Sequence, residues 1–169
     1  ADLQTDHVTG YERRAFQRVM DAKPDMILFA GDYLQVETHE EWERELPKLR
    51  EIFSEVKLAA PRGIYAVAGN VDYPTWAEIF SGVDATVTPA TRTFEDAGTA
   101  ETRDAVRVTC LSLADSFDTQ LELQAMSTAD TDSVLVHDQK PESVPAFHII
   151  LGHGPDFALS EVKAGLMLA

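Results

Sequence analysis

Cysteine is almost absent from the sequence, which contains only Cys110. A single thiol cannot form an internal disulfide, so no disulfide framework argues for secretion. Cys110 lies in the run VRVTCLSL, which predicts a small core residue. No stretch is long and apolar enough to cross a membrane, and no secretory signal pattern opens the chain. The compartment stays open, with the cytoplasm slightly favoured, and so does membrane association of the parent protein.

Basic residues are scarce: 14 Lys and Arg stand against 29 Asp and Glu, which gives a formal net charge of −15. This balance argues against broad, non-specific binding to nucleic acid, which needs a basic surface. A phosphate substrate remains possible, because bound metal ions can reverse the local field. The pattern Gly-x-Gly-x-x-Gly is also missing, and this excludes a nucleotide-binding redox domain.

The 169 residues suit one domain, and apolar spacing predicts its elements. We expect helices at 11–22 and 38–56, with short ones at 75–80, 121–126 and 155–162. Thr38 and Glu41 form a capping box at the start of the second helix, and Pro47 is expected to kink or divide it. Strands are expected at 26–30, 64–68, 86–88, 91–95, 105–114 and 147–151, an exposed turn at 96–104, and a further apolar run at 166–169.

The order of these elements predicts the fold class. Strand and helix alternate in the first half, which favours parallel, right-handed β-α-β units. Several strands without a long helix between them follow in the middle, and they indicate a second sheet packed on the first. We therefore expect an α/β fold, a layered β-sandwich flanked by helices.

Three buried runs end in the same way. MILFA is followed by Gly31-Asp32, IYAVA by Gly69-Asn70 and HIIL by Gly152-His153. In each, glycine allows a sharp turn or a close backbone approach, and the next residue can bind a metal. Ligands of open α/β sheets bind beyond the carboxyl ends of the strands, so these side chains should converge. Mixed oxygen and nitrogen donors suit Mn, Fe, Zn or Ni better than Ca or Mg alone.

The start of the chain adds two candidates. Asp2 and Gln4 are two residues apart, so in an extended segment their side chains point the same way. His7 follows closely and could enter the same site, although an exposed histidine in a turn is the alternative that we favour.

With these motifs in place, the chain resembles the calcineurin-like metallophosphoesterases. ADLQTDH, FAGDYLQ, AVAGNVD and ILGHGPDF match the family's ordered motifs along essentially the whole chain. The resemblance implies a four-layer α/β/β/α fold and a centre with two divalent transition metals. It implies a phosphoesterase that hydrolyses a small phosphate mono- or diester with a metal-activated hydroxide.

The resemblance also implies a role for each matching residue. Asp2 would bind the first metal, with Gln4 where the family usually has His. Asp32 would bridge both metals, and Asn70 and His153 would bind the second. Asp72 would fill the family's Asp/Glu position beside Asn70, which makes it the candidate catalytic residue.

Two departures and the ends of the chain bear on function. Gln4 is a weaker ligand than His, and Val71 replaces a His that in many relatives protonates the leaving oxygen or contacts the phosphate. The family pattern continues with a Gly-His-x-His motif beyond Ala169, so we expect residues 1–169 to be one metallophosphoesterase domain that is incomplete at both ends. The alternative function is a catalytically impaired member that serves as a binding scaffold.

Overall fold

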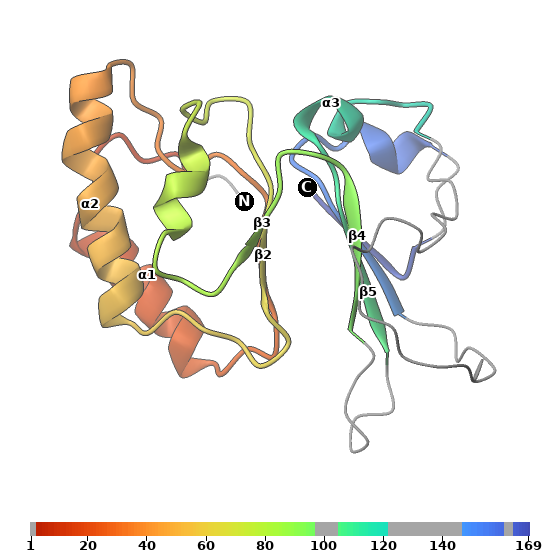
Figure 1. Cartoon of the computed structure of the whole chain (residues 1–169), viewed down its shortest axis with the longest axis horizontal. Helices are drawn as coiled ribbons and strands as arrows, with labels where there is room; N and C mark the ends of the chain where they lie inside the picture. The colour runs from red at the N-terminus through yellow and green to blue at the C-terminus, as the bar shows by residue number, and fades with distance from the viewer. Residues whose placement is uncertain (1–2, 97–104, 122–146, 161–163) are drawn as a thin grey trace, which may run out of the picture.

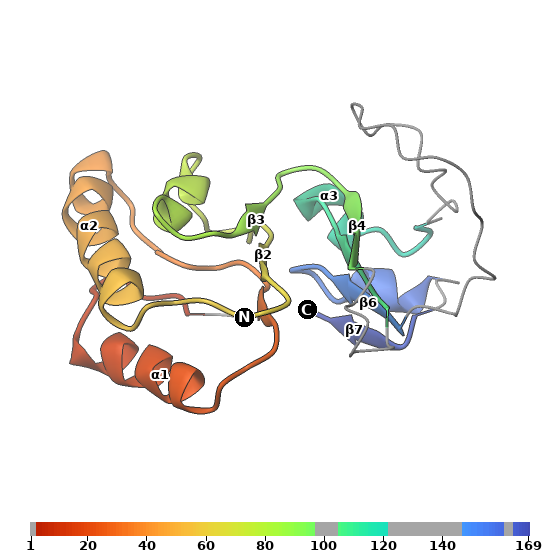
Figure 2. The ribbon, with the colours of Figure 1, turned by 60° about the horizontal axis from the view of Figure 1, so that its bottom comes forward.

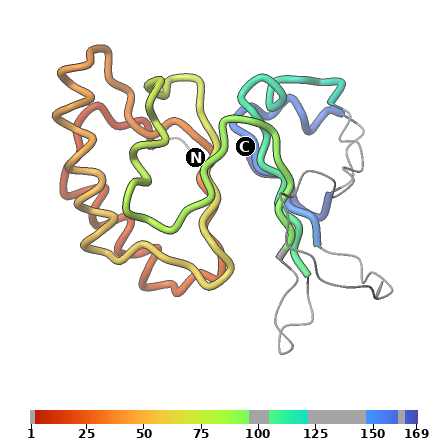
Figure 3. Tube along the Cα trace, viewed as in Figure 1, coloured from red at the N-terminus to blue at the C-terminus, as the bar shows by residue number. Residues whose placement is uncertain are grey.

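The computed structural model describes residues 3–96, 105–121, 147–160 and 164–169. Two sheets stand face to face, each with helices on its outer side (Figure 1). The trace passes through the first sheet and its helices and then crosses once into the second, at residues 88–91 (Figure 3). The predicted order of an α/β half followed by a strand-rich half is therefore confirmed.

The first sheet is parallel, as predicted. It contains β1 (Ile27–Phe29), β2 (Ile64–Ala66) and β3 (Thr86–Val87) in that order. Helix α2 (His39–Glu55) connects β1 to β2, and the 3-10 helix η1 (Trp76–Phe80) connects β2 to β3. Parallel neighbours require such crossovers, so the carboxyl ends of β1 and β2 lie at one edge of the sheet.

Both long helices begin with a capping box. Thr38 and Glu41 cap α2, as the sequence predicts. Thr9 and Glu12 cap α1 (Gly10–Asp21) in the same way, and the pattern Thr-x-x-Glu was a signal for this start. Helix α2 is one continuous helix, so Pro47 does not divide it, and the alternative of a kink stays a prediction. The buried apolar face of α2, which contains Trp42, Leu46, Leu49, Ile52 and Phe53, compensates for the hydrogen bond that proline cannot donate.

The second sheet has the order β4-β5-β6-β7. Strand β4 (Arg92–Asp96) pairs antiparallel with β5 (Val106–Cys110), and β6 (Phe147–Leu151) and β7 (Leu166–Leu168) follow in parallel. The run predicted as a strand to residue 114 leaves the sheet after Cys110. Its last residues open the short helix α3 (Leu113–Ser116), and η2 (Asp156–Leu159) follows β6.

Alternating side chains build three apolar layers. Ile27, Phe29 and Ile64 face the helices, whereas Leu28, Tyr65 and Val67 face the second sheet. Val108, Cys110, Ile149 and Leu151 complete that inter-sheet core. Ile150 points to the outer side, where it packs with Phe157 of η2. The expected α/β/β/α layering is thus present, and Figure 2 shows the helices of the first half on the side away from β4–β7.

Some predictions fall elsewhere in the chain. The turn at 96–104 and the helix at 121–126 lie outside the described residues, apart from their first positions. None of the helices that the structure describes is long and apolar enough to cross a membrane.

Candidate metal centre

The ends of β1 and β2 touch each other backbone to backbone. Gly31 and Asp32 both have left-handed φ angles, 88° and 56°. A Cβ atom on Gly31 would lie 2.5 Å from the Cα atom of Gly69, and a Cβ atom on Gly69 would lie 2.1 Å from Oδ1 of Asp32. Both glycines are therefore required by close approach, as the sequence predicts, and they hold Asp32 beside the residues that follow β2.

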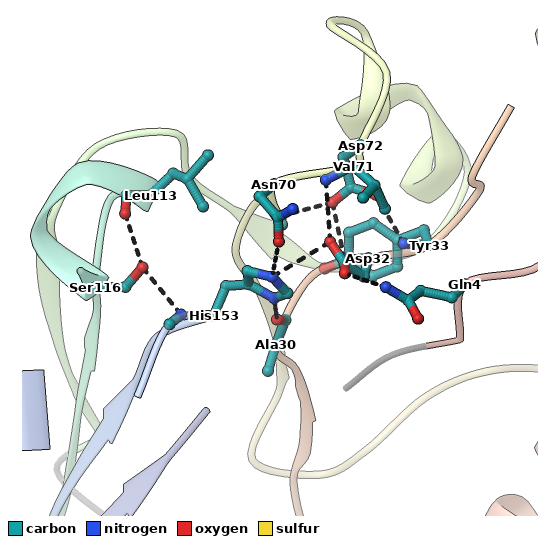
Figure 4. A network of polar contacts seen from close by, with 12 residues as sticks. Gln4, Ala30, Asp32, Tyr33, Asn70, Val71, Asp72, Leu113, Ser116 and His153 are labelled. Carbon is teal, nitrogen blue, oxygen red and sulfur yellow. Dashed lines mark hydrogen bonds and ion pairs between the residues drawn. The ribbon is translucent and has the colours of Figure 1, made fainter. Parts of the chain in front are cut away.

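His153 brings the second sheet to this point (Figure 4). Its Nδ1 atom lies 2.8 Å from the backbone oxygen of Ala30, and its Nε2 atom lies 2.6 Å from Oδ1 of Asn70. The same Nε2 atom lies 3.3 Å from Oδ1 of Asp32. The side chains of His153 and Asp32 are only 7% and 3% exposed. Three of the predicted site residues are thus in contact.

The hydrogen bonds determine which lone pairs are available. A carbonyl oxygen can only accept, so Nδ1 of His153 carries a proton and donates it to Ala30. In the neutral ring Nε2 then has a lone pair, and it faces two oxygen atoms that also carry lone pairs. A proton or a cation between these atoms would stabilise such an arrangement. A metal-binding histidine held through its other nitrogen by a backbone carbonyl has this same arrangement.

The donor set fits a divalent transition metal. One imidazole nitrogen, one amide oxygen and one carboxylate oxygen are borderline and hard ligands of the kind that Mn, Fe, Zn and Ni accept. In the part of the chain that the structure describes, no group of three or more His, Cys, Asp and Glu side chains gathers as a metal site. Asn70 supplies the third donor, and the predicted ligand Asp2 lies outside the described residues.

Asp72 contacts the backbone and connects the two strand ends. Its Oδ1 atom accepts from the amide of Tyr33 at 2.7 Å, and its Oδ2 atom accepts from the amides of Gly69 at 2.7 Å and Asp32 at 3.1 Å. Burial raises the pKa of Asp72 above its usual value, against the opposing effect of these three amides. The contacts make Asp72 a residue that positions Asp32, and its catalytic role stays a prediction.

Gln4 also meets Asp32, on the other carboxylate oxygen. Its Nε2 atom donates to Oδ2 of Asp32 at 2.8 Å, and its backbone amide donates to the backbone oxygen of Asp32 at 2.8 Å. Gln4 is therefore at the predicted site. Its amide nitrogen, which has no lone pair for a metal, faces the carboxylate.

Neither the side chain of Val71 nor that of His7 is hydrogen-bonded to Asp32. The backbone amide of Val71 donates to Oδ1 of Asp32 at 3.2 Å, so this position stabilises the carboxylate through its main chain. His7 is 65% exposed and lies 3.2 Å from the carboxylate of Asp6. The structure thus agrees with the expected exposed histidine.

The aromatic residues after the motifs are mainly packing residues. Tyr33 and Trp76 are buried and stack with ring centroids 5.6 Å apart, and the Tyr33 hydroxyl donates to the backbone oxygen of Val67. Burial raises the pKa of Tyr33 well above its usual value, so it remains a neutral phenol. Tyr73 is half-buried and stacks on Trp42.

Cys110 is a core residue, as predicted. It is fully buried between the sheets, and burial raises the pKa of its thiol to about 12. A thiol with that pKa is not a nucleophile at neutral pH.

The residues that hold the turn at His153 were not predicted from the sequence. The buried Ser116 accepts from the amide of Gly154 at 3.1 Å and donates to the backbone oxygen of Leu113 at 2.8 Å. Phe117 contacts the ring of His153 edge-on, at a centroid distance of 6.2 Å. The pattern Ser112-x-x-Asp115, an N-terminal cap, was a signal for helix α3, which carries Ser116.

One of three comparisons with known proteins found a match. A family model described as calcineurin-like phosphoesterase matches residues 4–165. Neither the comparison with curated proteins nor the comparison with solved structures found a match. The match spans every strand and helix described above except β7. The chain belongs to the calcineurin-like phosphoesterase family.

Proposed function

We propose that the protein is a metal-dependent phosphoesterase that hydrolyses a small phosphate mono- or diester. One observation carries the proposal: Nε2 of His153 faces Oδ1 of Asn70 and Oδ1 of Asp32, while its Nδ1 donates to Ala30. These atoms would hold a divalent transition metal. Membership of the family supports the same class of reaction.

A divalent cation supplies two things to phosphoester hydrolysis, polarisation of a phosphoryl oxygen and a water molecule of lowered pKa. The chain supplies the position. Ala30 orients the His153 ring, and Asp72 and Val71 hold Asp32 through backbone amides at the carboxyl edge of the first sheet. Mn is the metal we would add first, because it accepts imidazole, amide and carboxylate donors together.

The side chain of Val71 bears on the substrate. Valine can neither protonate a leaving oxygen nor donate to a phosphate. We therefore propose substrates with a good leaving group, such as diesters of acidic alcohols, which need less proton transfer as the ester bond breaks.

A second candidate function is a binding scaffold on the same fold. The hydrogen bond from Nε2 of Gln4 to Oδ2 of Asp32 favours it, since it occupies one oxygen of the central carboxylate. The contacts among Asp32, Asn70 and His153 oppose it, because a scaffold does not require three ligand atoms aimed at one point.

The test is hydrolysis of bis(4-nitrophenyl) phosphate by the full-length protein with and without Mn²⁺. Wild type is compared with Asp32→Asn, which keeps the size of the side chain but removes its negative charge. His7→Ala is the matched control, because His7 is exposed and outside the candidate site. We expect Mn²⁺-dependent turnover that falls by about 100-fold or more in Asp32→Asn and is unchanged in the control. A folded full-length protein without turnover in any transition metal would indicate the scaffold.

A further inference from the structure

Gln4 and Asp32 are joined twice, through the main chain and through the side chains. The backbone amide of Gln4 donates to the backbone oxygen of Asp32, and Nε2 of Gln4 donates to Oδ2 of Asp32, both at 2.8 Å. Figure 4 shows the Gln4 side chain reaching Asp32 from the side away from His153. The two carboxylate oxygens therefore have different partners.

Neighbouring backbone contacts fix the segment that carries Gln4. The amide of Thr5 donates to the backbone oxygen of Tyr33, and the amide of Gln35 donates to the backbone oxygen of Thr5. Further along, the amide of Val8 donates to Oε2 of the buried Glu45 at 2.9 Å. The segment thus lies against residues 32–35 as a short parallel bridge, and Gln4 is held beside Asp32 by more than its own side chain.

The chemistry of the two groups determines how the amide is oriented. A carboxylate oxygen accepts, so the nitrogen of the Gln4 amide faces Oδ2, and this nitrogen cannot bind a cation. The other oxygen, Oδ1, lies near Nε2 of His153, which in turn contacts Oδ1 of Asn70. Oδ1 therefore faces other ligand atoms and accepts only the longer hydrogen bond from the Val71 amide, at 3.2 Å, whereas Oδ2 accepts the shorter one from Gln4 Nε2.

We propose that this chain binds one divalent transition metal, between Asp32 Oδ1, Asn70 Oδ1 and His153 Nε2, and that the Gln4 amide takes the place of a second ion at Asp32 Oδ2. The inference rests on the metal dependence proposed above. It departs from the two-ion centre that the family resemblance implies. A hydrogen bond from a neutral amide satisfies Oδ2 without a second positive ion.

The test counts ions without using activity. The full-length protein is equilibrated with excess Mn²⁺, dialysed, and analysed for metal per chain. Electron paramagnetic resonance of the same samples distinguishes an isolated Mn²⁺ from a coupled pair bridged by a carboxylate. We expect about one ion per chain and the spectrum of an isolated ion in the wild type.

Two variants of Gln4 test its role. Gln4→His and Gln4→Glu each place a metal-binding atom where the amide nitrogen lies, so we expect about two ions per chain and a coupled spectrum in at least one of them. Gln17→His is the matched control, because Gln17 is exposed on α1 and the change adds a histidine away from Asp32. It should keep about one ion.

The outcomes separate the two proposals. Two coupled ions in the wild type would overturn the single-ion inference and leave the metal-dependent phosphoesterase intact. One ion in both folded Gln4 variants would overturn the role assigned to Gln4. No ion in the folded wild type would overturn the inference and the proposed function together. The wild-type count alone decides the first and third outcomes, even where a variant does not fold.

Discussion

Nε2 of His153 lies 2.6 Å from Oδ1 of Asn70, although the two residues follow strands of different sheets. Asn70 comes after β2 of the first sheet, and His153 comes after β6 of the second. The candidate centre therefore depends on how the sheets pack, through an inter-sheet core that contains Val67, Val108 and Leu151. Each of the following predictions tests one contact that holds this arrangement.

Replacing His153 should weaken metal binding without unfolding the protein. His153→Ala removes the imidazole nitrogen and leaves Asn70 and Asp32 as oxygen donors only. We expect Mn²⁺ affinity to fall by at least about 10-fold in calorimetric titration, the lower bound for losing even an indirect metal contact. His7→Ala, at an exposed histidine, is the control and should bind as the wild type. Equal affinity in His153→Ala and wild type would place the metal elsewhere.

Removing the Asp72 carboxylate should destabilise the fold. Asp72→Ala leaves the amides of Asp32, Tyr33 and Gly69 without their acceptor. We expect a loss of about 1–3 kcal/mol in the free energy of unfolding, measured with urea. Asp72→Asn should also lose stability, because its single oxygen can still accept but its NH2 group would face an amide that needs an acceptor.

The control for Asp72 is Asp84→Asn, at an exposed aspartate. The midpoint of urea unfolding should be the same in this variant as in the wild type. If Asp72→Ala also unfolds at the wild-type midpoint, the three amides do not depend on this carboxylate for stability.

Ser116 should affect the metal through the turn that holds His153. Ser116→Ala removes the acceptor of the Gly154 amide, one residue after His153, and touches no predicted ligand. We expect Mn²⁺ affinity to fall by about 10-fold, the usual size of an indirect effect on a metal ligand. Ser116→Thr retains a hydroxyl and should recover part of the affinity. A destabilised Ser116→Ala protein with unchanged affinity would reduce Ser116 to a purely structural role.

Glu45 should make the protein sensitive to acid. Burial raises the pKa of Glu45, but hydrogen bonds from Lys48, Arg44 and the amide of Val8 outweigh it and lower this pKa from 4.5 to about 2. The folded state therefore favours the charged form. The contribution of the Glu45 carboxylate to the stability of the folded state is complete above pH 4.5 and is lost as the pH falls from there through about 2.

Glu45→Gln tests this directly. The variant should be less stable than the wild type at neutral pH, and the difference in urea midpoint should shrink as the pH falls from 4.5 toward 2. Glu51→Gln, at an exposed glutamate of the same helix, should show no such convergence. A constant difference between wild type and Glu45→Gln across this range would contradict the lowered pKa.

Local sequence patterns predicted the elements of the fold well. The apolar runs before Gly31, Gly69 and Gly152 are strands, because continuous apolar stretches suit strands buried on both faces. The exit of the chain after Cys110 was missed, since apolar spacing alone cannot show where an apolar stretch leaves the sheet for helix α3. The expected division of α2 at Pro47 was wrong, because the effect of a proline depends on the packing of the rest of the helix.

The contacts of the site were less predictable. Asp32, Asn70 and His153 could be predicted because each lies in the turn after a strand, and ligands of α/β sheets bind beyond the carboxyl ends of strands. The amides of Asp32 and Tyr33 on Asp72 and the amide of Gln4 on Asp32 could not, since these partners are separated along the chain and meet only after the turn at Gly31 is formed.

The most direct test of the central claim is a crystal structure of the full-length protein grown with Mn²⁺, with anomalous scattering measured for manganese. We expect an anomalous peak within bonding distance of Nε2 of His153, Oδ1 of Asn70 and Oδ1 of Asp32. We also expect that Nδ1 of His153 still donates to the backbone oxygen of Ala30. A crystal saturated with Mn²⁺ and without a peak at these three atoms would contradict the account.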